Sequence, residues 1–396
     1  MAADEWCFVN ALMVDMIRME RYMAKSKEPI YMQLYKKLRE DIVSGVYPFN
    51  SKLPSKRTLA DEKGVSLITV EHAYGLLADE GYIETRERSG YYVCFTKDAL
   101  FSGFEKTSDN AVFMTDSQRG VSMVKDSQEA VSVDHPSFPF SVLSRTMRRV
   151  LSDYSDRIMR KPPNSGCTEL REALKKYLAR NKDMHVETEQ IIIGSGAEYL
   201  YGMIAELLGR DKIYAIESPS YKKIEQVYRA LELSFEMLPL VRDGIDSRAL
   251  AETKADVLHT SPFRSFPSGV SASASKRHEY IRWAGSADRF IIEDDFESEF
   301  TSALKPVDTL FNLSDKDNVI YMNTFSKTIS PALRTGYMVI PKKLLRSFGE
   351  RVGFYSCTVP TFEQLVLAEL ISSGDFERNI NRIRRSIRKG SSKDDI

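Results

Sequence analysis

Apolar side chains recur at helical spacing in the first part of the chain, between residues 28 and 96. The first stripe consists of Ile30, Leu34, Leu38 and Ile42, with Tyr31 and Tyr35 beside it. This spacing predicts an amphipathic helix that ends at Gly45, because apolar residues three and four apart share one helix face. A second, short helix is expected to begin at Pro54-Ser55 and to end at Gly64.

A third helix and a hairpin are predicted next. Ser66 follows the turn Gly64-Val65 and is a natural N-cap for a helix that reaches about Asp79. Two β-rich runs, 82–85 and 91–93, flank Ser89-Gly90 and indicate a two-stranded wing. Two helices separated by a glycine-containing turn, followed by a wing, predict a winged helix-turn-helix. In such a unit the second helix of the pair enters the major groove of DNA.

Six residues of this unit are candidates for contact with DNA: Arg57, Ser66, Thr69, His72, Arg86 and Arg88. The arginines would hold phosphates or reach a groove, whereas the side chains at the start of the third helix would reach base edges or backbone. Residues 28–96 carry nine Lys or Arg against ten Asp or Glu. We therefore expect modest affinity for DNA with a shallow dependence on salt. A winged helix used only for protein contact is the alternative.

From residue 134 onward, β-rich runs alternate with helical stretches. Strands are predicted at 190–193, 212–216, 256–259, 290–292 and 319–321, and helices at 170–178 and 198–208. Such alternation predicts an α/β domain with a mainly parallel sheet. The polar stretch 97–133 has no sustained period, which indicates a linker. We therefore divide the chain into an N-terminal extension (1–27), a DNA-reading domain (28–96), a linker (97–133) and an α/β domain (134–396).

Chemically informative residues follow the predicted strands, where parallel sheets usually bind ligands. They are Ser195, Gly196 and Ala197; Tyr221; Asp294; and Thr324, Ser326, Lys327 and Arg334. The first group precedes a helix whose N-terminus favours an anion, and the tyrosine ring can stack on a flat cofactor. Each feature alone is weak, since a lone lysine is usually solvated and an acid after a strand is often an N-cap.

Together these residues meet the needs of one kind of cofactor. An aldehyde that carries a phosphate and a pyridine ring needs an amine for a Schiff base and an acid that keeps the ring nitrogen protonated. It also needs hydroxyls, an arginine and a helix end for its phosphate. Lys327 supplies the amine, Asp294 the acid and Arg334 the guanidinium, in the expected chain order. Hydroxyls for the phosphate come from Ser195, Thr324 and Ser326.

Two segments of the chain resemble known families. The stretch LPSKRTLADEKGVSLITVEHAYGLLADEGYIETRERSGYYV resembles the DNA-binding domain of GntR-type bacterial regulators. The Asp294-to-Lys327 separation and the FSK…R spacing resemble fold-type I pyridoxal-phosphate aminotransferases. From residue 29 to about 388 the chain is thus similar to the MocR subfamily. This resemblance implies a homodimer, a Schiff-base role for Lys327, a pyridinium-partner role for Asp294, ring stacking by Tyr221 and phosphate binding by Arg334.

The sequence departs from that family at several positions. Leu67 stands where an arginine usually follows the cap serine, which removes a DNA contact. Phe296 stands where the family has a tyrosine whose hydroxyl would bond the cofactor's ring oxygen, so we expect weaker cofactor binding. Phe263 and Arg264 replace a polar Ser-His pair. Few residues follow Lys327, so we expect the chain to lack most of the family's small C-terminal subdomain, which holds a substrate carboxylate. A helix expected over 378–389 carries six basic residues and no acid, and is most simply a solvated surface.

Composition narrows the function classes. Lys plus Arg equals Asp plus Glu at 56 each, so a nucleic-acid role depends on the local motif and not on bulk charge. The four cysteines are far apart and form no C-x-x-C pair, which argues against a zinc site or disulfides and favours a reducing cytosol. No apolar run of about 18 residues occurs, so we expect no membrane helix and a cytoplasmic protein.

We therefore expect a DNA-binding transcription regulator whose aminotransferase-like domain binds pyridoxal phosphate, and an amine, as effector. One alternative is an aminotransferase with a DNA-binding appendage. The expected loss of the small subdomain speaks against it, because a substrate would be poorly oriented. Another alternative is a regulator that binds DNA but no ligand. The sequence leaves open the promoter, the sign of regulation and the identity of the amine.

Overall fold

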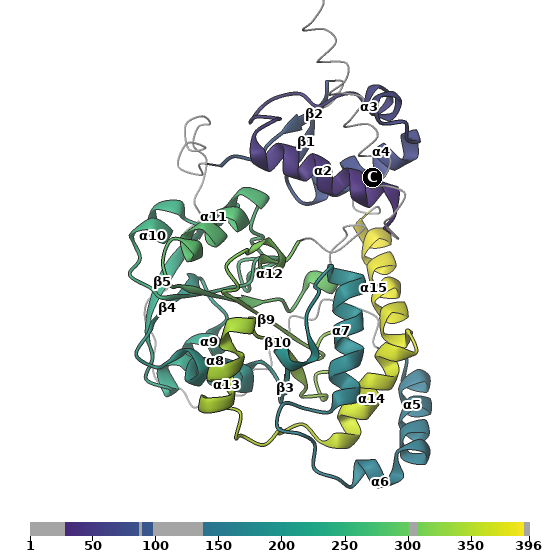
Figure 1. Ribbon diagram of the computed structural model, residues 1–396, viewed down its shortest axis with the longest axis vertical. Helices are drawn as coiled ribbons and strands as arrows, with labels where there is room; N and C mark the ends of the chain where they lie inside the picture. Colours follow the sequence, from purple (N-terminus) through teal and green to yellow (C-terminus); the bar gives the residue numbers. More distant parts are fainter. Residues whose placement is uncertain (1–27, 87–88, 98–137, 301–307, 392–396) are drawn as a thin grey trace, which may run out of the picture. The chain divides into compact units, whose positions relative to one another are not determined.

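The computed structural model describes residues 28–86, 89–97, 138–300 and 308–391 (Figure 1). It divides into two compact units, and the boundary between them along the chain falls after Lys97. The N-terminal extension, Arg88 and nearly all of the predicted linker lie outside the described residues. Within the described part, no helix is long and apolar enough to cross a membrane.

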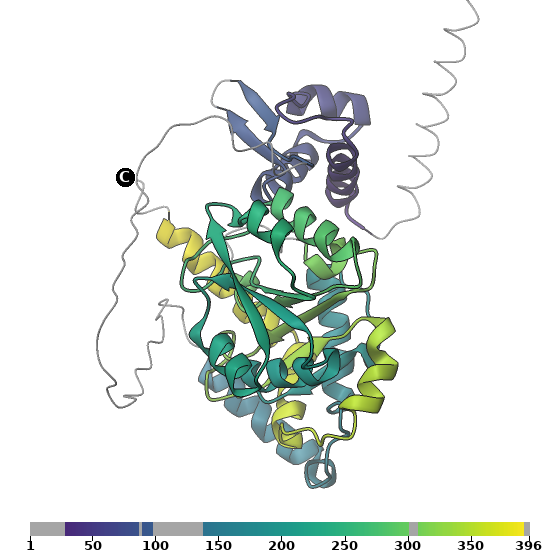
Figure 2. The same cartoon turned by 90° about the vertical axis from the view of Figure 1, so that its left-hand side faces the viewer.

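The N-terminal unit contains the predicted three helices and hairpin. They are α2 (Ile30–Ser44), α3 (Lys56–Lys63), α4 (Leu67–Asp79), β1 (Ile83–Arg86) and β2 (Gly90–Val93). The Ser55 and Ser66 side chains accept hydrogen bonds from the N–H groups of Thr58 and Thr69, both at 3.1 Å, and so fix the starts of α3 and α4. Figure 2 shows β1 and β2 as two neighbouring antiparallel arrows. Ile30 departs from the predicted stripe, because it is the first residue of α2 and is 49% exposed.

The C-terminal unit is built on an eight-stranded sheet of order β3-β10-β9-β8-β7-β4-β5-β6. The strands are β3 (Ile191–Gly194), β4 (Ile213–Ser218), β5 (Ser234–Val241), β6 (Gly244–Ile245), β7 (Val257–Thr260), β8 (Phe290–Asp294), β9 (Val319–Thr324) and β10 (Gly336–Val339). Five strands run parallel, from β5 through β4, β7 and β8 to β9, while β6 and β10 pair antiparallel with their neighbours. The mainly parallel α/β sheet is therefore confirmed.

Helices cover both faces of this sheet. They are α5 (Phe140–Asp153), α6 (Ser155–Ile158), α7 (Thr168–Lys182), α8 (Ala197–Leu208), α9 (Lys222–Ala230), α10 (Ser247–Glu252), α11 (Ala274–Gly285), α12 (Leu310–Leu313), α13 (Leu345–Arg351), α14 (Thr361–Ser372) and α15 (Asp375–Ser391). In Figure 1, α7 and α14 lie on one side of β3 and β10, and α8, α9 and α13 on the other. Ile192 packs into the core under α8, whereas Ile191 and Ile193 pack into the core under α7 and α14. Side chains alternate along a strand, so a strand with two buried faces is apolar throughout.

The basic helix near the end of the chain begins earlier than predicted. Its first residue is Asp375, and Asp375 and Glu377 lie in its first turn, where carboxylates favour the helix N-terminus. Arg378 pairs with Asp375 at 2.7 Å, and Arg180 of α7 pairs with Glu377 at 2.6 Å. The basic stretch thus belongs to a helix of mixed charge that also carries acids.

Candidate functional site

The segments that carry the predicted cofactor-binding residues begin or end at one edge of the sheet. The parallel strands β4, β7, β8 and β9 end at that edge, and the antiparallel β10 begins there, because Gly336 is paired with both Thr324 and Gly194. Ser195 follows Gly194, and Arg334 precedes Gly336 by two positions. Segments far apart in sequence therefore meet where ligands of such sheets bind.

An arginine lies over the first turn of α8. Gly196 caps this helix with a φ of +99°, and a Cβ atom at Gly196 would lie 3.1 Å from Nη2 of Arg334. The glycine thus leaves space for the guanidinium beside backbone N–H groups that favour an anion. Arg334 also donates to Glu198 at 2.7 Å, and the same carboxylate accepts from Lys223 at 3.0 Å. Glu198 is not among the residues that the sequence predicted for the site.

Asp294 is buried and held by a tyrosine. The Tyr201 hydroxyl of α8 donates to its Oδ2 atom at 2.5 Å. Burial, reinforced by the Asp294 charge, raises the pKa of Tyr201 well above its ordinary value, so the hydroxyl remains a donor. Nε2 of the buried His259 lies 3.7 Å from the same oxygen and has no hydrogen-bond partner among the described residues. Nδ1 of His259 bonds the Tyr228 hydroxyl at 2.8 Å. This polar network was also not predicted.

Tyr221 lies near both of these features. It caps α9, is 36% exposed and meets the Phe266 ring edge-on at 5.8 Å between centroids. Partial burial raises the pKa of Tyr221, and Lys223, Glu198, Arg334 and Asp294 all act on it electrostatically. The stacking role of Tyr221 stays a prediction.

Lys327 occupies the turn after β9 and is 40% exposed. Its Nζ atom forms an ion pair with Glu297, and it lies 4.6 Å from the centre of the Phe296 ring. Glu297 also accepts from Arg264 at 3.2 Å. A carboxylate that the sequence reasoning missed therefore neutralises the predicted Schiff-base lysine. Ser195 and Ser326 are half-buried. Ser195 lies in the loop after β3, and Ser326 lies in the loop after β9.

The acids around Asp294 have separate structural partners. Glu293 caps α12 by accepting from the N–H groups of Leu310 and Phe311 at 2.8 and 2.9 Å. Asp295 pairs with the fully buried Lys182 at 2.6 Å. A buried carboxylate is costly without such a partner. Asp294 is thus the acid of this run that is directed toward α8 and the predicted cofactor residues.

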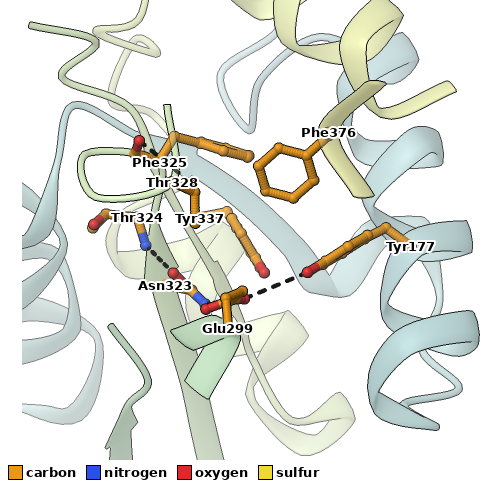
Figure 3. Close-up of a pocket in the computed structure, with 8 residues that line it drawn as sticks. All are labelled: Tyr177, Glu299, Asn323, Thr324, Phe325, Thr328, Tyr337 and Phe376. Atoms are coloured by element: carbon orange, nitrogen blue, oxygen red, sulfur yellow. Dashed lines mark hydrogen bonds between the residues drawn. The ribbon is translucent and has the colours of Figure 1, made fainter. Parts of the chain in front are cut away.

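A narrow crevice adjoins the end of β9 (Figure 3). Its lining residues are Tyr177, Glu299, Asn323, Thr324, Phe325, Thr328, Tyr337 and Phe376. Thr324 is the predicted site residue among them, and its N–H donates to the Asn323 side chain at 2.6 Å. The other predicted cofactor residues are not part of this lining, so the crevice is separate from the candidate cofactor site.

The described DNA-contact candidates lie on α3, at the start of α4 and on the hairpin. The Thr69 hydroxyl is bonded to that of Ser66 at 2.8 Å, and the exposed His72 meets the Tyr31 ring edge-on. Arg57 of α3 is exposed. Arg86 is already engaged, because it donates to both Glu84 and Asn50 at 2.7 Å.

Comparisons with known proteins agree with both units. Residues 30–93 match the family of bacterial regulatory proteins of the gntR type, and residues 137–392 match aminotransferase class I and II. An uncharacterized HTH-type transcriptional regulator of Bacillus subtilis, YdeL, is 32% identical over 91% of this chain and 77% of its own length. The probable rhizopine catabolism regulatory protein MocR of Rhizobium meliloti is 29% identical over 90% of this chain and 74% of its own. A kynurenine aminotransferase structure from Pyrococcus horikoshii superposes with a TM-score of 0.58 at 26% identity, covering 63% of this chain and 65% of that one.

Proposed function

Because this chain belongs to the MocR-type family of bacterial transcriptional regulators, we propose that an amine bound in its aminotransferase-like domain controls how its winged helix binds DNA. The chain is a DNA-binding regulator, and pyridoxal phosphate is the cofactor of its aminotransferase-like domain. The identity of the amine, the dimer and the residue roles below are part of the proposal.

The buried Asp294, fixed by Tyr201 at the edge from which Lys327 and Arg334 also emerge, carries the assignment of the cofactor site. When bound, pyridoxal phosphate supplies an aldehyde that combines with amines and a ring that withdraws electrons once its nitrogen is protonated. Asp294 would hold that proton on the ring nitrogen, because its carboxylate is buried and fixed. Lys327 would present the amine.

The phosphate would be held by Arg334 and by backbone N–H groups at the start of α8. At Gly196 the absence of a side chain lets the Arg334 guanidinium lie close to these N–H groups, so both would contact the same phosphate. Tyr221 would cover one face of the ring. Phe296 offers no hydroxyl to the ring oxygen, so orientation depends on Asp294 and Arg334, and we expect weaker binding than a tyrosine at this position would give.

The test is an absorption spectrum of the whole chain after addition of pyridoxal phosphate and removal of the excess. A retained yellow band in the wild type that is absent from Lys327→Ala supports the site. Lys175→Ala, which removes an exposed lysine paired with Glu187, is the control and should keep the band. A folded wild type without the band, or an unchanged Lys327→Ala, would overturn the assignment of Lys327.

We further propose a homodimer that binds two operator half-sites. A ligand can act on DNA binding only if it favours one arrangement of the two readers, and a two-fold dimer matches a two-fold operator. Light scattering of the eluted protein at micromolar concentration tests this directly. A monomer alone would rule out the dimer, and unchanged DNA affinity across a panel of amines would rule out control by them.

A further inference from the structure

The exposed start of α4 is apolar. Leu67 and Ile68, the first two residues of this helix, are 44% and 64% exposed. Neither side chain is buried. The residues of α4 that pack into the core, such as Val70 and Leu77, lie about one turn or more further along the helix. Ser66 caps the helix at this point and fixes their backbone. Two aliphatic side chains therefore project from the end of the helix that faces DNA in a helix-turn-helix.

The same helix lacks the chemistry that reads guanine. None of its 13 residues is Lys or Arg, and its charged residues are Glu71 and Asp79. Glu71 pairs with Lys56 at 2.6 Å and so neutralises a cation beside it. Guanine presents two acceptors in the major groove and is read mainly by Arg or Lys, whereas thymine presents a methyl group that apolar side chains contact.

We propose that Leu67 and Ile68 read the 5-methyl groups of thymines, so that the preferred half-site carries thymines where α4 enters the major groove. This proposal rests on the proposed function only in that α4 enters the groove. Phosphate contacts come from outside the helix: Arg57 and Lys63 of α3 are exposed and have no ion-pair partner in the described part of the chain. Sequence preference thus arises from burial of methyl groups, and charge supplies orientation.

The experiment uses the whole chain and DNA that differs by methyl groups alone. Sequences are selected from a random duplex pool of about 30 base pairs, long enough for two half-sites one turn apart. Each selected duplex is then made with deoxyuridine in place of thymidine, which removes only the 5-methyl groups. Burial of one methyl group corresponds to about fourfold in affinity, so each contacted thymine should cost about fourfold in Kd.

Two variants separate the proposal from general effects of uracil on the duplex. Ile68→Ala should bind the thymine duplex more weakly and show a smaller thymine-to-uracil ratio, whereas Ile30→Ala, at another exposed isoleucine, should keep the wild-type ratio. Leu67→Arg should select guanine-containing half-sites. Equal affinity of the wild type for thymine and uracil duplexes, or an Ile68→Ala ratio equal to the wild-type ratio, would overturn the inference. Failure to enrich any duplex would instead overturn DNA binding by α4.

Discussion

Replacing Glu198 by Gln should strengthen the binding of pyridoxal phosphate. The Glu198 carboxylate is bonded to Arg334 at 2.7 Å and to Lys223 at 3.0 Å, beside the first turn of α8. In the proposed site the phosphate of the cofactor binds this arginine and this helix end, so it would compete with an anion of like charge. Glutamine preserves the shape of the side chain and removes its charge.

The expected size of the effect follows from charge separation and exposure. Two unit charges about 5 Å apart interact by about 0.8 kcal/mol in water and by about 3 kcal/mol at an effective dielectric constant of about 20. The Glu198 side chain is 30% exposed, which places it between these limits. After allowance for screening, removal of the charge should improve binding by about 1–2 kcal/mol, or about five- to thirtyfold in Kd.

The improvement should be the same across neutral pH. Burial alone would raise the pKa of Glu198, but its backbone hydrogen bond, Lys223 and Arg334 together hold that pKa below the ordinary value. Glu198 is therefore fully charged at neutral pH. The ratio of the two Kd values should stay constant between about pH 7 and pH 8, where the phosphate, with a second pKa of about 6, also keeps its charge.

Titration of the whole chain with pyridoxal phosphate, followed by absorbance, measures both constants, and inorganic phosphate serves as a competitor. Glu206→Gln is the matched control, because it removes an ion pair with Arg210 from the same helix. A Glu198→Gln variant that binds the cofactor no tighter than the wild type, or an equal improvement in Glu206→Gln, would contradict this prediction.

Substitutions elsewhere test the packing that supports both units. Lys182→Met leaves the buried Asp295 carboxylate without its cationic partner, so the free energy of unfolding in urea should fall by about 3–5 kcal/mol. Lys175→Met, which removes a more exposed ion pair of the same helix, should change that free energy little. Burial raises the pKa of Glu293 to about 8, so the folded chain keeps a proton that the unfolded chain loses above about pH 4.5. The free energy of unfolding should therefore fall as pH rises from about 5 to 8, and an equal slope in Glu293→Gln would contradict this. Ser66→Ala removes the cap of α4 and should cost about 1 kcal/mol, seen as a lower thermal midpoint; an unchanged midpoint would show that the cap contributes nothing.

Local patterns in the sequence were sufficient for most of the fold. The starts of α3 and α4 were predictable because Ser55 and Ser66 cap their own helices, an interaction that spans three residues. β5, β6 and β10 were not predicted. β10 enters the sheet antiparallel between β3 and β9, and no local pattern specifies such an insertion. The start of α15 was predicted at residue 378, where the basic stretch begins, whereas the helix begins at Asp375 with two acids in its first turn.

In the candidate site, likewise, residues could be predicted from local sequence, but their distant interaction partners could not. Strand ends indicated Asp294 and Lys327, since residue type and chain order suffice for that inference. The partner of Arg334 did not follow from the sequence, because Glu198 lies 136 positions away. Likewise, consecutive acids look alike in sequence, yet alternation along the strand sends Glu293 and Asp295 to one side and Asp294 to the other.

Glu198 and Glu297 together bear on how the site is used. Each gives a predicted cofactor-binding cation an anionic partner within the chain: Arg334 in one case and Lys327 in the other. A ligand bound as proposed would have to displace both carboxylates, which would lower its apparent affinity by the free energy of those pairs. An enzyme that keeps its cofactor through many turnovers benefits from tight binding, whereas a regulator benefits from occupancy that follows the concentration of free ligand. In the proposed regulator this competition would tie occupancy of the site to the level of free ligand, which is what control of DNA binding by a ligand requires.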